Sequence, residues 1–204
     1  MNKLPRIAIT GGIGSGKSYI CKLLADHGIE VYDCDAAAKH LMATNTALQE
    51  KLSEVVGKEV FKNGILQKPV LAKFLLASDK NKQTINEVVH PAVAADFMAS
   101  DYQWLESAIL FDAKFDKRIN FDFIVCVIAP EDVRIERITK RDNISREQAQ
   151  QWINRQMPQE DMARMADFTI VNDGFTDLTA TIELLKATIA INTSKKYPIK
   201  KEQG

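Results

Sequence analysis

The residues with the clearest chemical meaning are Gly-Gly-Ile-Gly-Ser-Gly-Lys-Ser at positions 11–18, directly after the apolar run Ile7-Ala8-Ile9. This order predicts a β-strand, a glycine-rich turn and a helix whose first N–H groups are unpaired and carry a positive dipole end. Lys17 would reach the β- and γ-phosphates of a nucleotide, and the Ser18 hydroxyl would take a coordination position on Mg²⁺. An ordinary glycine-rich turn needs neither a lysine nor a hydroxyl in this register. The segment therefore predicts a loop that binds a nucleoside triphosphate.

A second group of polar residues follows the apolar run 29–32, where Asp33-Cys34-Asp35 leads into a predicted helix. If this strand lies beside the first strand, Asp33 emerges next to the phosphate loop. A carboxylate there can accept the proton of an attacking hydroxyl or help to order Mg²⁺. Asp35 is better explained as the cap of the helix. An acid beside a phosphate loop repels the ligand unless it serves the chemistry, which favours a functional role for Asp33.

A third group is a basic pair of helices after the fourth predicted strand, with Arg134, Arg137, Lys140, Arg141, Arg146 and Arg155. Arg137 and Arg141 are four residues apart and share a helix face. In a kinase such a segment closes over the nucleotide and presents guanidinium groups to the transferred phosphoryl group. For Arg134 and Arg146 the sequence favours a solvated face with neighbouring acids as partners.

Alternating strands and helices must position these residues. The strand-like apolar runs are 6–10, 29–32, 102–111, 121–129 and 168–171. Several runs are too continuous for a half-exposed strand and indicate burial on both faces. Five such strands with helices between them predict an α/β fold with a five-stranded parallel, doubly wound sheet, whose ligand site lies at the carboxyl ends of the strands.

The connection between the second and third strands is long and carries most of the remaining helix signals. Helices are predicted at 46–56, from Pro69 to Leu76, at 79–89 and at 91–98, with a turn at Asn63-Gly64. A helical insertion of this kind would form a cap beside the phosphate site.

Composition excludes several classes of protein. The chain has 204 residues, which suits one α/β domain with an inserted subdomain. Lys and Arg number 27 and so do Asp and Glu, which gives no overall field for nucleic acid or an anionic membrane. The first strand begins too early for a signal peptide, and no apolar run approaches the roughly 20 residues that span a bilayer. Cys21, Cys34 and Cys126 lack metal-ligand spacing and suit reduced thiols in a cytoplasmic protein.

The other phosphate-loop classes lack their motifs here. No Asp stands three residues before a Gly, and Asn81-Lys82 is followed by Gln83 rather than the pattern that reads guanine, which counts against a GTPase switch. The fourth strand ends in Ala129-Pro130, without the acids of an ATP-driven motor. A small kinase remains, in which an acceptor molecule meets the γ-phosphate.

The whole chain resembles the dephospho-CoA kinase family, through motifs that occur in order: the loop at 11–18, Asp33-x-Asp35-x-x-x-Lys39, His90-Pro91, the acid-closed strand 108–112, Arg137-x-x-x-Arg141-Asp142, Ala166-Asp167 and Asn172-x-Gly174. The resemblance implies ATP-dependent phosphorylation of the 3′-hydroxyl of dephospho-CoA, the last step of coenzyme A synthesis, with Mg²⁺. It also implies a nucleoside-monophosphate-kinase-like P-loop fold. The core would be 1–35 and 101–204, the helical CoA-binding insertion about 36–100 and the lid about 137–160.

The resemblance also implies roles for single residues. Asp33 would be the general base, and Lys17, Arg137 and Arg141 would act with it in catalysis. ATP would be bound by Gly12, Ile13, Gly14, Ser15, Gly16, Lys17, Ser18, Tyr19, Asn172 and Gly174, with Mg²⁺ at Ser18. The acceptor would be bound by Asp33, Lys39, His90 and Asp112. His90 is equally explained as an ordinary residue before a helix-starting proline.

The chain departs from the family pattern at four positions: Tyr19 for Thr, Cys34 for Ala, Lys39 for Arg and Asp112 for Glu. The first two remove no needed group. Lys39 weakens a bidentate phosphate clamp to a single contact, and Asp112 shortens the reach of its carboxylate. A nucleoside or nucleotide kinase of the same fold, and an ATP-dependent binding protein or assembly switch, stay open as alternatives.

Overall fold

A computed structural model describes residues 4–194 of the chain. It divides into two compact units, each described by itself below. The first unit comprises Met1–Tyr32, Tyr102–Asp112 and Asn120–Gly204, and the second comprises Asp33–Asp101 and Ala113–Ile119. Within the described part of the chain, no helix combines the length and the apolar character needed to cross a membrane.

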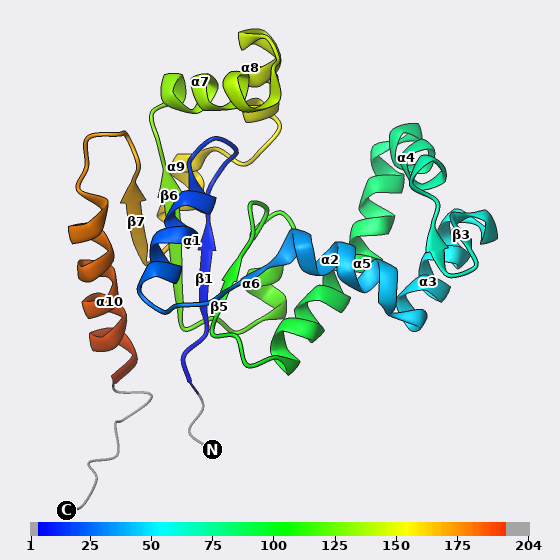
Figure 1. Cartoon of the computed structure of the whole chain (residues 1–204), viewed down its shortest axis with the longest axis horizontal. Helices are drawn as coiled ribbons and strands as arrows, with labels where there is room; N and C mark the ends of the chain where they lie inside the picture. Colours follow the sequence, from blue (N-terminus) through cyan, green and yellow to red (C-terminus); the bar gives the residue numbers. More distant parts are fainter. Residues whose placement is uncertain (1–3, 195–204) are drawn as a thin grey trace, which may run out of the picture. The chain divides into compact units, whose positions relative to one another are not determined.

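The first unit is built on a five-stranded sheet with the strand order β2-β5-β1-β6-β7 (Figure 1). The strands are β1 (Ile7–Thr10), β2 (Val31–Asp33), β5 (Trp104–Glu106), β6 (Phe123–Ile128) and β7 (Phe168–Val171). β1 pairs in parallel with β5 and β6, and β6 pairs in parallel with β7. The prediction of a five-stranded parallel sheet is confirmed.

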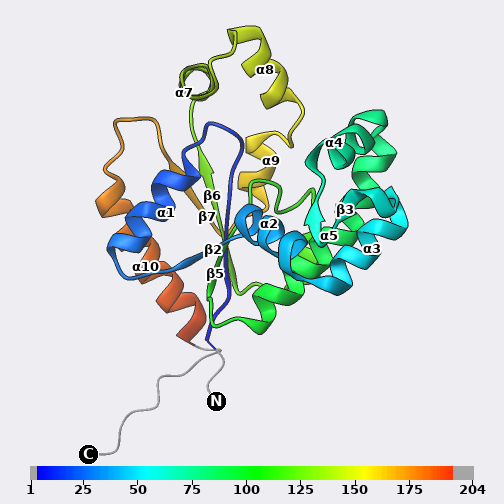
Figure 2. The same ribbon diagram turned by 45° about the vertical axis from the view of Figure 1, so that its right-hand side comes forward.

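Helices cover both faces of this sheet. They are α1 (Lys17–Asp26), α9 (Gln159–Arg164) and α10 (Leu178–Ser194). The other two helices, α7 (Glu131–Asp142) and α8 (Arg146–Asn154), pack on each other beyond the carboxyl ends of the strands (Figure 1). Ile20 and Leu24 of α1 pack with Ile182 and Leu185 of α10 in the main core on one face of the sheet. α9 packs against β6 from the other face (Figure 2). Burial on both faces explains why the strand sequences are continuously apolar.

Two expectations about the sheet are wrong. The strand expected at 102–111 ends at Glu106, because Ser107 makes the last bond to β1 through its N–H and its hydroxyl then accepts a bond from the N–H of Ile109. Residues 108–111 form a turn, so Asp112 does not close a strand. The second strand is also not the neighbour of the first, since β5 lies between them.

The second unit is mainly helical. Its elements are α2 (Cys34–Thr44), α3 (Thr46–Val56), η1 (Lys58–Val60), β3 (Phe61–Lys62), β4 (Ile65–Leu66), α4 (Lys68–Ala77), α5 (Asp79–Ala99) and α6 (Phe115–Arg118). α2, α3, α4 and α6 all pack on α5. The turn predicted at Asn63-Gly64 is confirmed and joins the antiparallel pair β3 and β4, which the sequence did not predict. Both turn residues have positive φ, 52° and 75°, as a two-residue hairpin turn requires.

The two helices expected at 79–89 and 91–98 are one continuous helix, α5, with Pro91 inside it. Pro91 has no N–H to donate to the carbonyl of residue 87, a loss of about 3 kcal/mol or more in a helix interior. Val89, Val93 and Phe97 are buried along the same helix, and each such side chain contributes about 1.5–3 kcal/mol. Their burial exceeds the cost of the proline, so packing keeps the helix continuous.

Replacing this proline should therefore stabilise the protein. Pro91→Ala restores a helix donor but also loosens the unfolded chain, and we expect a net gain of about 1–2 kcal/mol in the free energy of unfolding. Pro69→Ala is the matched control, because Pro69 lies in the first turn of α4, where its missing N–H has no helix partner anyway. Thermal and urea unfolding measure both. A destabilised Pro91→Ala variant would show that the packing around α5 requires the proline.

Candidate functional site

The candidate site is built around the loop that joins β1 to α1. Gly16 caps α1 in the left-handed conformation, with φ 92°, and a Cβ there would lie 2.1 Å from the side-chain nitrogen of Asn172. A Cβ on Gly11 would lie 2.2 Å from the carbonyl oxygen of Val127. Both positions therefore require glycine, for backbone conformation and for the close approach of neighbouring groups. The loop predicted from the sequence is present, with a helix N-terminus directly behind it.

Lys17 is the first residue of α1 and is 9% exposed. Its Nζ donates a hydrogen bond of 2.7 Å to the carbonyl oxygen of Gly11 and lies 3.8 Å from a carboxylate oxygen of Glu106. Glu106 ends β5, in register with Ile9, so its carboxylate reaches the loop from the carboxyl edge of the sheet. The lysine is held in place by one carbonyl and one acid.

Sequence reasoning missed Glu106, because the strand was expected to continue to an acid at Asp112. The available signal was the position of Glu106 directly after the apolar pair Trp104-Leu105, with the polar Ser107 behind it. That change from apolar to polar marks the end of a buried strand, where a parallel sheet places its ligand groups.

Two buried hydroxyls lie at the loop without a hydrogen-bond partner among the described residues, those of Thr10 and Ser15. Ser15 Oγ is 3.0 Å from the position that a Cβ on Gly11 would occupy, which places it at the start of the loop. Ser18 and Tyr19 are exposed on the first turn of α1. The site thus combines two unpaired hydroxyls, a lysine and an exposed serine at a helix N-terminus. This set of groups is suited to binding a polyphosphate together with a divalent cation.

Arg137 of α7 and Asn172, the residue after β7, hold the far side of the loop. Arg137 donates from Nη1 to the carbonyl oxygens of Gly14 and Ser15, both at 3.3 Å. Its Nη2 donates to the backbone oxygen of Asn172 at 3.1 Å and to the side-chain oxygen at 3.3 Å. The side-chain nitrogen of Asn172, which is buried, donates to the carbonyl of Ser15 at 2.9 Å. These two predicted residues and the loop therefore meet in one place.

Arg134 does not lie on a solvated face as expected. It is 4% exposed, and its Nε donates a hydrogen bond of 2.9 Å to the carbonyl oxygen of Ile13. Ile135 and Ile138 of α7 are buried as well, in a cluster with two residues of α8 against which Ile13 of the loop packs. The sequence did not indicate this burial, because Arg134 is a charged residue in a helix with many other charged residues. Arg146 does pair with an acid at the surface, Asp132.

Arg141 has different partners from Arg137 although both lie on α7. Its side chain is 60% exposed and bonds the neighbouring carboxylate of Asp142, with the closest pair of atoms at 2.7 Å. This hydrogen bond raises the pKa of Arg141 and lowers the pKa of Asp142. In this structure only Arg137 of the two predicted lid arginines contacts the loop residues.

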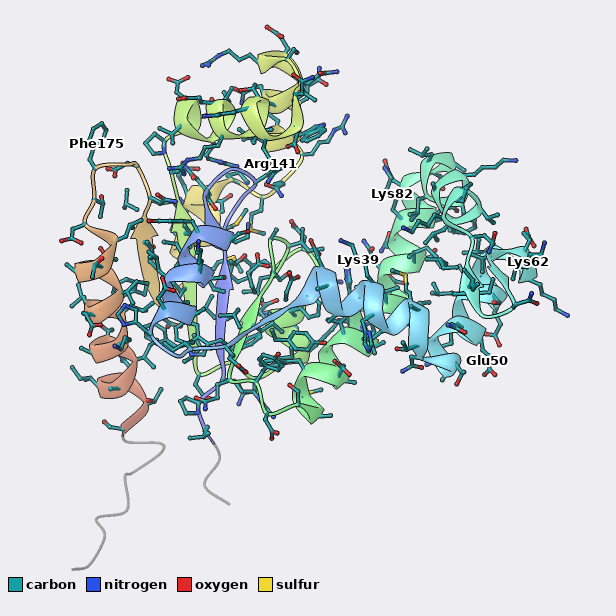
Figure 3. The ribbon with its side chains drawn as sticks, viewed as in Figure 1. Lys39, Glu50, Lys62, Lys82, Arg141 and Phe175 are labelled. Carbon is teal, nitrogen blue, oxygen red and sulfur yellow. The ribbon has the colours of Figure 1, made fainter. Side chains whose placement is uncertain are left out.

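Asp33 begins the second unit and caps α2. Its Oδ1 accepts hydrogen bonds from the N–H groups of Asp35 (2.8 Å) and Ala36 (2.9 Å). The cap was expected at Asp35 but is Asp33, two residues earlier, and Asp35 lies in the first turn of the helix. Asp33 is exposed, so its second oxygen is open to a ligand. Lys39 lies on the same helix, exposed (Figure 3).

His90 lies half-buried on α5, with its ring centroid 5.5 Å from that of Phe115 on α6. Burial lowers the pKa of His90, the positive charge of Arg118 lowers it further, and Asp35 acts in the opposite direction. The imidazole is therefore neutral near pH 7, a form that can both donate and accept a hydrogen bond.

The remaining predicted residues make fewer contacts. Asp112 is exposed within the turn that follows β5. Gly174 has φ 91° and no atom within 4 Å of where a Cβ would be, in a segment whose tip carries Phe175 at 94% exposure (Figure 3). Asp173 stabilises this segment by accepting bonds from the N–H groups of Phe175 and Thr176.

Comparison with known proteins agrees with this arrangement. The sequence model of the family described as dephospho-CoA kinase matches residues 6–177. The chain belongs to the dephospho-CoA kinase family. A dephospho-CoA kinase of Bacteroides fragilis is 41% identical over 176 residues, which cover 83% of this chain and 85% of the relative.

Solved structures show the same fold. A crystal structure of a protein from Thermus thermophilus has 30% sequence identity and a TM-score of 0.72, and the match covers 93% of this chain and 98% of that one. Dephospho-CoA kinase from Campylobacter jejuni has a TM-score of 0.61 at 18% identity, with the same coverage, and supports the P-loop kinase fold alone.

The contacts of Arg137 and Arg141 predict different effects of removing each charge. Arg137→Met removes the two nitrogens, Nη1 and Nη2, that donate to the loop and to Asn172. The KM for ATP should therefore rise and kcat should fall, with kcat/KM about 10–100-fold lower. Arg141→Met leaves the loop contacts intact and should change kcat alone. Steady-state kinetics with varied ATP separate the two patterns. If both variants stay within about twofold of the parent, neither guanidinium acts on the nucleotide.

Proposed function

We propose that this protein transfers the γ-phosphoryl group of ATP to the 3′-hydroxyl of dephospho-CoA, giving coenzyme A and ADP in the last step of coenzyme A biosynthesis. The observation that carries the proposal is a complete phosphate loop, with Lys17 held between the Gly11 carbonyl and Glu106, in a member of the dephospho-CoA kinase family. The phosphate loop supports an ATP-dependent reaction, and family membership supports the acceptor.

The first unit supplies the nucleotide side of the site. The N–H groups of the loop bind the phosphate chain, and Lys17 places its charge at the β- and γ-phosphates. Ser18 and Glu106 are the residues that would hold Mg²⁺, which neutralises phosphate charge when bound. Glu106 also lies 3.8 Å from the amino group of Lys17 and helps to orient it. Asn172 and Gly174 belong to the nucleotide side as well.

The acceptor side uses Asp33, Lys39, His90 and Asp112. Oδ1 of Asp33 is occupied by the two capping N–H groups, so we assign Oδ2 as the atom that takes the proton of the 3′-hydroxyl. The cap also fixes the direction of the carboxylate, which a general base needs. Lys39 contributes a single positive contact for an acceptor phosphate, and the neutral imidazole of His90 contributes a hydrogen bond.

Arg137 and Arg141 complete the proposed catalytic group by stabilising charge on the transferred phosphoryl, and a lid at about 137–160 excludes water. The core at 1–35 and 101–204 and the CoA-binding insertion at about 36–100 keep the roles inferred from the family. A cytosolic location stays a prediction from cysteine usage; among the described residues, Cys21, Cys34 and Cys126 form no disulfide.

The identity of the phosphoryl acceptor distinguishes a dephospho-CoA kinase from a nucleotide kinase and from an ATP-dependent binding protein. With Mg²⁺ and ATP, the protein should convert dephospho-CoA to coenzyme A with matching ADP release, and should leave AMP, CMP and shikimate largely unchanged. Chromatography of the products measures this directly. Preference for AMP or CMP would assign a nucleotide kinase of the same fold. ATP hydrolysis without transfer to any acceptor would assign a binding protein or switch.

Asp33→Asn tests the base, because asparagine also caps helices well but cannot accept the proton. We expect kcat to fall by about 10²–10⁴-fold while the KM for ATP and the melting temperature change little. Asp35→Asn is the control, since Asp35 lies in the same helix turn without the capping role. Near-normal turnover of Asp33→Asn would reduce Asp33 to a helix cap.

A further inference from the structure

Both polar backbone groups of Ile13, at the tip of the phosphate loop, are bound by side chains from outside the loop. Its N–H donates to Oε1 of Gln156 at 2.7 Å, and its carbonyl accepts from Nε of Arg134 at 2.9 Å. Arg134 comes from the first turns of α7, and Gln156 follows α8. Two segments that are distant in sequence therefore hold a single loop residue from both sides.

The loop also packs closely on the backbone of Arg134. A Cβ on Gly14 would lie 2.7 Å from the carbonyl oxygen of Arg134, and a Cβ on Gly12 would lie 2.5 Å from its Nη2. The contact is therefore tight on both sides of Ile13. A shift of α7 at Arg134 has to move the loop or break these contacts.

These bonds act on the groups that bind phosphate. In a trans peptide the N–H of one residue points opposite to the carbonyl of the residue before it. A donor that fixes the Ile13 carbonyl therefore fixes the direction of the Gly14 N–H, away from α7. Arg137 and Asn172 fix the Ser15 carbonyl, and with it the Gly16 N–H, in the same way. The N–H of Ser15 bonds the Gly12 carbonyl within the loop, at 3.2 Å.

The burial of Arg134 indicates that it has a role other than stability. Burial lowers the pKa of this guanidinium, although Glu131 and Glu160 favour its charged form. A buried cation costs several kcal/mol of desolvation, and an apolar side chain of similar size is often as stable in its place. None of the ion pairs found among the described residues within 4.0 Å involves Arg134. Its bond to the loop carbonyl is the clearest use of the charge.

We propose that Arg134 and Gln156 are positioning residues, which hold Ile13 so that the loop N–H groups are directed at the phosphates before the nucleotide arrives. Neither residue touches the reacting atoms. The relevance of these residues to catalysis rests on the proposed function. The test needs only the binding of a nucleotide phosphate to the loop.

The test measures binding of Mg·ADP by calorimetry, without acceptor, to the full chain. Arg134→Met and Gln156→Met should each weaken binding by about tenfold, the effect of one lost hydrogen bond to a charged or buried group. The double variant should weaken Mg·ADP binding by less than the product of the two single fold changes, because both side chains hold Ile13. Arg146→Met is the matched control, an arginine replaced on the exposed side of the same helix pair.

Kinetics separate positioning from a general structural effect. The KM for ATP should rise in both variants while the KM for dephospho-CoA stays within twofold. Arg134→Lys, which keeps the charge without the fixed geometry of the guanidinium, should lie between Arg134→Met and the parent. If Arg134→Met fails to fold, Gln156→Met carries the test, because it changes a neutral, half-buried side chain.

Binding within twofold of the parent in Gln156→Met and in any folded Arg134→Met overturns the proposal. Equal weakening by Arg146→Met, or an equal rise in the KM for dephospho-CoA, also overturns it. A parent that binds Mg·ADP but transfers nothing to dephospho-CoA overturns the proposed function instead, and the binding comparison still decides the roles of Arg134 and Gln156.

Discussion

The carbonyl groups of Ile13, Gly14 and Ser15 each accept hydrogen bonds from side chains outside the phosphate loop, and the rest of the candidate site depends on this anchoring. A glycine-rich loop is flexible by composition, because glycine loses more conformational freedom on folding than any other residue. Donors on α7 and after β7 offset that cost by fixing consecutive peptide planes. A phosphate then meets N–H groups that are already oriented, which is the condition for strong electrostatic binding.

The same anchoring bears on the lid proposed at about 137–160. Arg134 and Arg137 lie in the first half of α7 and are bonded to the loop, whereas Arg141, near the end of the helix, is exposed and bonded to Asp142. Any closing movement that keeps the loop intact has to leave the first half of α7 in place.

Asp33 combines an observed structural role, the cap of α2, with the proposed role of general base. As the cap of α2 it satisfies two N–H groups that would otherwise lack partners, and this fixes the carboxylate with one oxygen still open. The base proposed at this position is therefore held in one direction by the two capping bonds.

The sequence by itself determined the phosphate loop, the parallel sheet and most helices, because glycine spacing, apolar runs and caps are local signals. Tertiary structure decided the rest. Glu106 became the acid beside Lys17 only because β5 ends early next to β1, and Arg134 became buried only because its face of α7 packs on the loop. α5 continues through Pro91 because buried side chains outweigh a lost hydrogen bond. Strand order, burial of a charge and the continuity of a helix depend on contacts between distant residues, which local patterns do not contain.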